Sequence, residues 1–332
     1  MTVRKSTGKR HIGRAMWYAK PGTVEIRAET LKDPLPNEVR VRTLFSGISR
    51  GTERLVLNGA VPESEWSRMR APMQSGNFPF PVKYGYCATG IVEGGSSEML
   101  GRTVFCLHPH QDMFIAPADM VVTVPDDVPA KRATLTANME TALNAHWDGA
   151  TGPGDRVVIV GAGIVGLLVA YIAAQIPRTQ TIVVDIDEGR RKLVTELGAR
   201  FALPQEAPQD ADIVFHTSAT EAGLATALEC AGFEARVIEL SWYGANSPQV
   251  ALGAAFHSRR LTLQSSQVGH VAPSRRARWT YQRRLAKALD LLRDPRLDAL
   301  VYDEIAFNDA PALIPDILNG SATKLAPVLR YF

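Results

Sequence analysis

The first third of the chain consists of short segments in which apolar and polar residues alternate, separated by glycine and proline. Between residues 15 and 125 these segments include "TVEIRAE", "EVRVRTLFSGI", "TGIVEGG" and "DMVVTVPDD". An apolar residue at every second position is typical of strands with one buried face, and frequent turns favour a barrel or a sandwich. Residues 58–81 interrupt the alternation and predict a long loop. The sequence therefore predicts an all-β domain at the start of the chain.

Beyond residue 129 the pattern changes to continuous apolar segments that alternate with segments of helical spacing. The apolar segments include "VVIV", "TIVVDID", "ADIVF" and "ARVIEL", which are typical of parallel strands buried on both faces. The alternation predicts a doubly wound α/β domain. Residues 273–292 have the pattern of an amphipathic helix, and residues 302–331 predict a return to the first domain.

These patterns divide the chain into three parts. We predict a flexible basic tail over residues 1–14 and a β-rich domain over residues 15–135 and 270–332. The doubly wound domain is predicted over residues 136–269.

A glycine motif follows the first apolar segment of the second domain. In "VVIVGAGIVG", Gly161, Gly163 and Gly166 come directly after a strand and open a helix, and Asp185 ends the next strand. This combination predicts a dinucleotide site, with the pyrophosphate at the helix N-terminus and the acid on the adenosine ribose. The predicted cofactor-binding residues are Gly161, Gly163, Ile164, Val165, Gly166, Asp185 and Arg190.

The acid at position 185 favours NAD over NADP, because a carboxylate repels the 2′-phosphate of NADP. Arg190 lies near enough in the sequence to weaken this preference for NAD. An alternative interpretation makes Arg190 a surface charge on the helix that follows the strand.

Composition points to a small-molecule substrate. Lys and Arg number 37 and Asp and Glu 34, and the net charge of +3 argues against a nucleic-acid or membrane-surface partner. No segment approaches the roughly 20 apolar residues of a membrane span. The three cysteines are widely spaced, which supports neither a disulfide framework nor a four-cysteine zinc lobe. We therefore expect a cytoplasmic protein.

Two further segments resemble the zinc-ligand motifs of zinc-dependent alcohol dehydrogenases. Residues 46–53, "SGISRGTE", are similar to "CGICGTD", and residues 85–90, "GYCATG", are similar to "GHExxG". With the β-rich first domain, the glycine motif and the returning C-terminus, the chain from about Ala15 resembles the medium-chain dehydrogenase/reductase superfamily. The resemblance implies an α/β protein with a GroES-like β-barrel catalytic domain and a Rossmann domain. It also implies an NAD(P)-dependent oxidoreductase that forms homodimers or homotetramers.

The resemblance ends at the metal ligands. The ligand positions hold Ser49, Tyr86 and, for the third ligand, Thr136 or Ala137. Zinc requires Cys, His or carboxylate ligands, so we predict no zinc and no other metal. The alternative is a metal held by "CLHPH", residues 106–110.

Within the superfamily, "SGISRGTERL" and the Gly-Tyr pair look most like the branch of bacteriochlorophyllide dehydrogenases, which oxidise a hydroxyethyl side chain. Cys87, in the glutamate position, departs from that pattern and leaves the substrate open.

Without zinc, the charge that develops on the substrate oxygen must meet a hydrogen-bond donor or general acid. By the resemblance, Tyr86 is the leading candidate, with packing as its alternative role. Ser49 and Thr52 are candidates for a proton relay or for satisfying backbone groups in a turn. Glu140 either orients Tyr86 or His108 or forms a structural salt bridge, and His108 is either the catalytic imidazole or a structural histidine.

Two features bear on the substrate. The cluster Arg275–Arg284 is either a solvated helix face or a grip for an anionic substrate. The strand end "ELSWYG" is expected to point at the cofactor, which makes Trp242 and Tyr243, together with Trp66, candidate pocket residues. Core packing is the alternative role of these aromatic residues.

The sequence thus predicts a zinc-independent, NAD-preferring oxidoreductase that interconverts an alcohol and a carbonyl by hydride transfer. One alternative is an enone or quinone reductase of the same superfamily. A second is a non-catalytic nucleotide-binding protein that acts as a sensor or a structural component.

Overall fold

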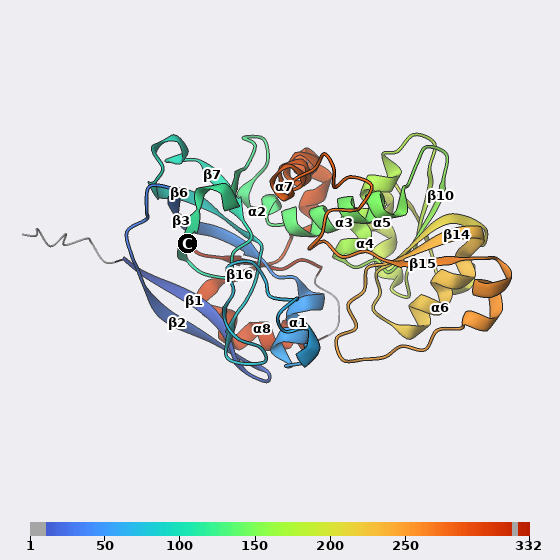
Figure 1. The fold of residues 1–332 in the computed structure, drawn as a ribbon, viewed down its shortest axis with the longest axis horizontal. Helices are drawn as coiled ribbons and strands as arrows, with labels where there is room; N and C mark the ends of the chain where they lie inside the picture. Colours follow the sequence, from blue (N-terminus) through green and yellow to red (C-terminus); the bar gives the residue numbers. More distant parts are fainter. Residues whose placement is uncertain (1–10, 321–324) are drawn as a thin grey trace, which may run out of the picture. The chain divides into compact units, whose positions relative to one another are not determined.

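The structure of the chain is a computed structural model that describes residues 11–320 and 325–332. The chain folds into two compact units (Figure 1). Unit 1 comprises Met1–Leu135 and Val301–Phe332, and unit 2 comprises Thr136–Leu300. Residues 270–300, which the sequence assigned to the β-rich domain, belong to unit 2.

Unit 1 is built mainly from strands. Its longer elements are β1 (His11–Lys20), β2 (Thr23–Leu31), β3 (Glu38–Gly47), α1 (Arg50–Leu57), β6 (Ala88–Gly95), β7 (Thr103–Cys106), β8 (Met113–Pro117) and α8 (Ala310–Asn319). Its shorter elements are β4 (Ser75–Gly76), β5 (Val82–Lys83), β9 (Val121–Thr123), α2 (Ala130–Ala133), β16 (Glu304–Ala306) and β17 (Val328–Arg330). One sheet has the order β2-β1-β5-β4, and the other has the order β16-β17-β3-β6-β7-β9 with β8 also paired to β3.

The alternating pattern places one face of these strands in a core. Val39 and Val41 of β3 pack with Val92 of β6, Val104 of β7 and Phe114 of β8, all of them buried. The C-terminal return is an antiparallel pairing of β17 with β3, in which Leu329 lies opposite Ser46. The last residues of the chain thereby reach the segment that resembles a zinc-ligand motif.

The N-terminal boundary differs from the expectation. Residues 11–14, which the sequence assigned to a flexible tail, form the first part of β1, and His11 pairs with Leu31 of β2. Cross-strand pairing with β2 holds these residues, a constraint that their basic composition does not reveal. Residues 1–10 of the predicted tail lie outside the described residues.

Unit 2 is a parallel sheet with the strand order β12-β11-β10-β13-β14-β15. Its strands are β10 (Arg156–Val160), β11 (Gln180–Val184), β12 (Arg200–Ala202), β13 (Ala211–His216), β14 (Ala231–Glu239) and β15 (Thr262–Ser265). Its helices are α3 (Thr136–Gly149), α4 (Ile164–Ala174), α5 (Arg191–Glu196), α6 (Glu221–Cys230) and α7 (Tyr281–Asp290).

Helices cover both faces of this sheet, which is why its strands are apolar throughout. Val158 and Val214 share a core cluster with Ala227 of α6. The neighbouring Phe215 points to the other face, where its ring lies 4.9 Å from that of His146 in α3. The strand order reverses between β10 and β13, and in such sheets ligands bind at this switch point, beyond the carboxyl ends of the strands.

The predicted amphipathic helix over residues 273–292 is shorter than expected. Helix α7 begins at Tyr281, because the Thr280 hydroxyl accepts a hydrogen bond from the backbone N–H of Arg283 and caps the helix there. Residues 273–278 form turns before it.

Candidate cofactor site and active-site residues

The glycine motif forms the turn between β10 and α4, and each glycine meets a different constraint. Gly161 has φ +113°, and a Cβ there would lie 2.8 Å from the Thr217 hydroxyl oxygen. A Cβ on Gly166 would lie 1.9 Å from the carbonyl oxygen of Gly161. A Cβ on Gly163 would meet nothing within 4 Å. Gly161 and Gly166 therefore shape the turn, while the backbone at Gly163 is open to a ligand.

The start of α4 has the properties of an anion site. Gly163 is the N-cap and provides no side-chain cap, so the first-turn N–H groups at Ile164 and Val165 have no side-chain acceptor at the cap. These donors and the positive end of the helix dipole favour a phosphate group.

Asp185 follows β11 and reaches the same turn. Its Oδ2 accepts a hydrogen bond from the backbone N–H of Ala162 at 2.5 Å, and its Oδ1 accepts one from the N–H of Asp187 at 2.8 Å. Because a carboxylate has about four acceptor positions, lone pairs remain for the hydroxyls of a ribose. The glycine turn, the α4 N-terminus and this half-buried acid together fit a dinucleotide.

Arg190, the other predicted cofactor residue, is paired within its own segment. Its Nε lies 3.1 Å from Oδ2 of Asp187. A role in cofactor binding stays a prediction for this residue.

Tyr86, Ser49 and Thr52 lie together in unit 1. The ring of Tyr86 packs edge-on against that of Tyr84, with the centroids 5.9 Å apart. Burial, with smaller contributions from Cys87 and Glu53, raises the pKa of Tyr86 above its usual value, while side-chain hydrogen bonds with Ser49 and Thr52 act in the opposite direction. Tyr86 therefore keeps its proton at neutral pH and is available as a hydrogen-bond donor.

Ser49 occupies the N-cap position of α1, yet its hydroxyl makes no capping hydrogen bond. The backbone N–H of Ser49 instead donates to Oε1 of Glu53 at 2.7 Å. The Ser49 hydroxyl therefore does not cap the helix, and it forms a side-chain hydrogen bond with Tyr86 instead.

Glu53 is the centre of a buried polar network that the sequence analysis did not assign. The carboxylate is fully buried, and its Oε2 accepts a hydrogen bond from the hydroxyl of Tyr18 at 2.6 Å and lies 3.0 Å from Nε2 of His110. On the other side of the imidazole, Nδ1 lies 2.6 Å from the Ser46 hydroxyl, which lies 2.8 Å from the Tyr331 hydroxyl. The network thus joins β1, β3, α1 and the C-terminus.

His108 lies outside this network. Its ring stacks on that of Phe114 at a centroid distance of 3.9 Å, and its Nδ1 lies 2.9 Å from the carbonyl oxygen of Pro109. Burial lowers the pKa of His108 to about 3, so the imidazole is neutral at physiological pH. Among the described residues, no hydrogen bond or ring contact joins His108 to Tyr86.

Glu140 belongs to unit 2, where it forms a buried ion pair. Its Oε1 accepts a hydrogen bond from Nε of Arg284 at 2.9 Å. Burial raises the pKa of Glu140, and the charge of Arg284 opposes this rise. Arg284 also donates to Oδ1 of Asn144 and to the backbone oxygens of Val268 and His270. The pair therefore ties α3 to α7 and the segment before it.

The predicted ligand positions hold no metal-binding group. Over residues 11–320 and 325–332, no three or more His, Cys, Asp or Glu side chains gather as metal ligands. Cys106 and Cys87 are buried, and burial raises the pKa of each thiol.

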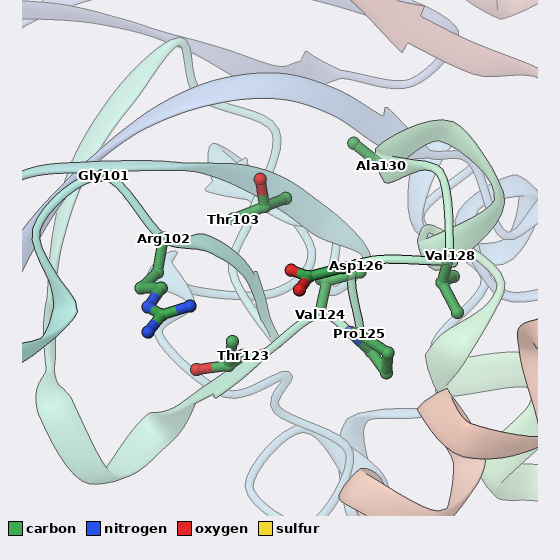
Figure 2. Close-up of a pocket in the computed structure, with 9 residues that line it drawn as sticks. All are labelled: Gly101, Arg102, Thr103, Thr123, Val124, Pro125, Asp126, Val128 and Ala130. Atoms are coloured by element: carbon green, nitrogen blue, oxygen red, sulfur yellow. The ribbon is translucent and has the colours of Figure 1, made fainter.

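Unit 1 contains a cavity of about 230 Å³. Figure 2 draws the residues that line it. Arg102 and Asp126 extend along its wall, and Thr103 and Thr123 add two hydroxyls. None of the candidate residues lines it. In the part of the chain that the structure describes, no helix is both long enough and apolar enough to span a bilayer.

Comparisons with known proteins agree with this fold. No protein-family model matches the chain. An uncharacterized zinc-type alcohol dehydrogenase-like protein of Haemophilus influenzae is 24% identical over 221 residues, which cover 62% of this chain and 60% of that protein. D-xylulose reductase of Scheffersomyces stipitis is 29% identical over 142 residues, which cover 43% of this chain and 37% of that protein. The chain thus matches less than two thirds of the length of these curated relatives.

Solved structures resemble the chain over nearly its whole length. A short chain alcohol dehydrogenase of Escherichia coli, solved with NADH, has a TM-score of 0.77 and 16% identity, with 96% of this chain and 99% of that chain covered. A putative zinc-binding dehydrogenase of Sinorhizobium meliloti, solved with NADP, has a TM-score of 0.77 and 17% identity, with 97% of this chain and 100% of that chain covered.

The two units thus have an α/β fold with a GroES-like and a Rossmann domain, as predicted. The resemblance to the medium-chain dehydrogenase/reductase superfamily is confirmed. The bacteriochlorophyllide branch stays a prediction.

The Glu53 network generates a prediction about stability. We expect Glu53→Ala to lower the free energy of unfolding by about 3–5 kcal/mol, because it leaves the Tyr18 hydroxyl and His110 buried without their acceptor. Glu63→Ala, at an exposed position of the same unit, is the control and is expected to stay within about 0.5 kcal/mol of wild type. Denaturant unfolding measures both, and equal losses in the two variants would contradict the assigned role of Glu53.

Proposed function

We propose that the protein is an NAD(H)-preferring, zinc-independent oxidoreductase that interconverts an alcohol and a carbonyl. The observation that carries the proposal is the convergence of the glycine turn, the uncapped N-terminus of α4 and Asp185 in unit 2. Bound there, a nicotinamide cofactor would supply or accept the hydride. The curated relatives named above include a xylulose reductase, which supports a hydroxyl and carbonyl pair as the reacting groups.

Binding of the cofactor falls to three parts of unit 2. The N–H groups at the start of α4 hold the pyrophosphate, and the open backbone at Gly163 permits close approach. The free lone pairs of Asp185 accept hydrogen bonds from the ribose hydroxyls, and its charge repels a 2′-phosphate.

Handling of the substrate oxygen falls to unit 1. Tyr86 donates a hydrogen bond to the oxygen on which negative charge develops, and Ser49 and Thr52 hold the phenol in place. This role replaces the Lewis acid of the zinc enzymes, because Ser49 and Tyr86 stand at two of the ligand positions and neither can hold zinc. We also propose a small-molecule substrate, a cytoplasmic location and a homo-oligomer, in line with the superfamily.

The cofactor preference is tested by titration. NADH should bind at least about tenfold more tightly than NADPH, which corresponds to about 1.4 kcal/mol, because Asp185 repels the additional phosphate. The substitution Asp185→Ser should reduce this difference in affinity between NADH and NADPH. Fluorescence titrations of both cofactors with both proteins measure it, and a preference of the wild type for NADPH would refute the assignment of Asp185.

The metal prediction is tested by elemental analysis of the dialysed protein. We expect much less than one zinc per chain, because Ser49, Tyr86 and Thr136 or Ala137 occupy the ligand positions. Stoichiometric zinc whose removal abolishes activity would overturn zinc independence and would direct attention to the segment 106–110.

The role of Tyr86 is tested by removing its hydroxyl. Tyr86→Phe should lower kcat by about 10²–10³, the usual cost of losing one preorganised donor, while NADH affinity stays unchanged. Tyr84→Phe, at the ring that packs against Tyr86, is the matched control and should retain nearly full activity. If Tyr86→Phe keeps wild-type turnover, the residue has a packing role only.

A panel of carbonyl and enone substrates provides the turnover assay and separates the alternatives. Product analysis distinguishes carbonyl reduction from transfer of hydride to a β-carbon. A protein that binds NADH tightly and turns over no substrate in the panel would favour the non-catalytic sensor.

A further inference from the structure

A second polar cluster lies at the carboxyl ends of β13 and β14, and neither the proposed catalytic role of Tyr86 nor the Asp185 site uses it. His216, the last residue of β13, is fully buried, and its Nδ1 lies 2.7 Å from Oε2 of Glu239, the last residue of β14. Its Nε2 lies 2.7 Å from the hydroxyl of Ser218. The Tyr243 hydroxyl donates to Oε2 of Glu239 at 3.3 Å, and the N–H of Ser241 donates to Oε1 at 2.7 Å.

The hydrogen bonds of this cluster engage both ring nitrogens of His216. A carboxylate only accepts, so Nδ1 of His216 donates to Glu239, while Nε2 pairs with the Ser218 hydroxyl. Ser218 in turn lies 3.0 Å from the Thr220 hydroxyl, which accepts from the N–H of Gly223. Both ring nitrogens of His216 therefore have hydrogen-bond partners within the cluster. At the exposed end of the cluster, the Glu239 carboxylate can still accept hydrogen bonds from a ligand.

Exposure identifies which member of the cluster can meet a ligand. The side chain of His216 is 0% exposed, whereas that of Glu239 is 16% exposed. Ser241 and Tyr243 beside it are also partly exposed. Burial beside the charge of Glu239 raises the pKa of Tyr243, which keeps this phenol protonated as a donor. The accessible surface of the cluster is thus a carboxylate flanked by two hydroxyls, a set that suits the vicinal hydroxyls of a sugar.

The position of the cluster relative to the glycine turn selects the sugar. A Cβ on Gly161 would lie 2.9 Å from the backbone nitrogen of Ser218, and the Thr217 hydroxyl donates to the carbonyl oxygen of Gly161 at 2.9 Å. The cluster therefore adjoins the turn on the β13 side, while Asp185 adjoins it on the β11 side. A dinucleotide binds across this switch point, with one nucleoside on each side of its pyrophosphate.

We infer that Glu239, positioned by His216, binds the ribose on the nicotinamide side of the cofactor, as Asp185 binds the adenosine ribose. This inference rests on the proposed function, since it concerns the second half of the same cofactor. Glu239 contacts the ligand directly, whereas His216 acts through it as a positioning residue.

The test uses two fragments that differ only in the second ribose. ADP ends at its second phosphate, and ADP-ribose carries the additional sugar without the nicotinamide. Glu239→Gln keeps the shape of the side chain and removes its charge. It should weaken binding of ADP-ribose by about tenfold or more, because a hydrogen bond to a charged acceptor is lost, and should leave binding of ADP unchanged. Calorimetric titration of the intact protein measures both.

Two matched variants complete the design. Asp185→Asn should weaken ADP and ADP-ribose alike, because both contain the adenosine ribose. Glu221→Gln changes an exposed acid at the start of α6, whose Oε2 accepts from the N–H of Gln249, and should affect neither fragment. His216→Gln should reproduce the selective loss of ADP-ribose affinity in weaker form, since the amide can still donate to Glu239.

The outcomes separate this inference from the proposed function. Selective loss of ADP-ribose affinity in Glu239→Gln supports it. If wild type binds ADP well and Glu239→Gln binds ADP-ribose as wild type does, or loses both fragments equally, the second-ribose site is overturned while the cofactor assignment stands. If wild type binds neither fragment nor NADH, the proposed function fails, and the inference fails with it.

Discussion

The close approach of Gly166 to the carbonyl oxygen of Gly161 is the constraint on which the nucleotide-binding unit depends. A Cβ at Gly166 would lie 1.9 Å from that oxygen, so only glycine lets α4 start directly against the end of β10. This start leaves the first N–H groups of α4 open at the carboxyl edge of the sheet. The same turn is held by Asp185 through Ala162 on one side and by Thr217 on the other. The turn thereby lies between the two ribose-binding acids that we propose.

Three carboxylates in the two units are buried or half-buried and have polar partners inside the protein. Their exposed fractions indicate which of them can also bind a ligand. Glu53 is 0% exposed and faces His110, so its charge is satisfied entirely within unit 1. Glu140 is 6% exposed and forms an ion pair with Arg284. Glu239 alone among the three reaches solvent to a useful extent. Desolvating a carboxylate is unfavourable unless partners compensate, so the first two are structural and the third has capacity left for a ligand.

The sequence was most informative where the chemistry depends on neighbours along the chain. The glycine turn and the acid that ends the next strand are local patterns, and in the structure Asp185 accepts a hydrogen bond from Ala162 in that turn. The choice between two histidines depends instead on tertiary contacts. His108 and His110 are two residues apart, but His108 stacks on Phe114 while His110 reaches Glu53 from another segment. No spacing rule separates the two, because their partners lie far away in the sequence.

The replacement of zinc ligands by hydroxyl groups also bears on how charge on the reacting oxygen is stabilised in the proposed reaction. A divalent cation lowers the pKa of a bound hydroxyl and stabilises the alkoxide from which hydride leaves. In unit 1, burial, with smaller contributions from Cys87 and Glu53, instead raises the pKa of Tyr86. A protonated Tyr86 stabilises by hydrogen bonding the oxygen of a carbonyl that is gaining charge, and the same hydrogen bond stabilises the alkoxide from which hydride leaves in the reverse reaction. Under the proposed function, Tyr86 with Ser49 and Thr52 therefore serves both directions of hydride transfer, because both pass through one transition state.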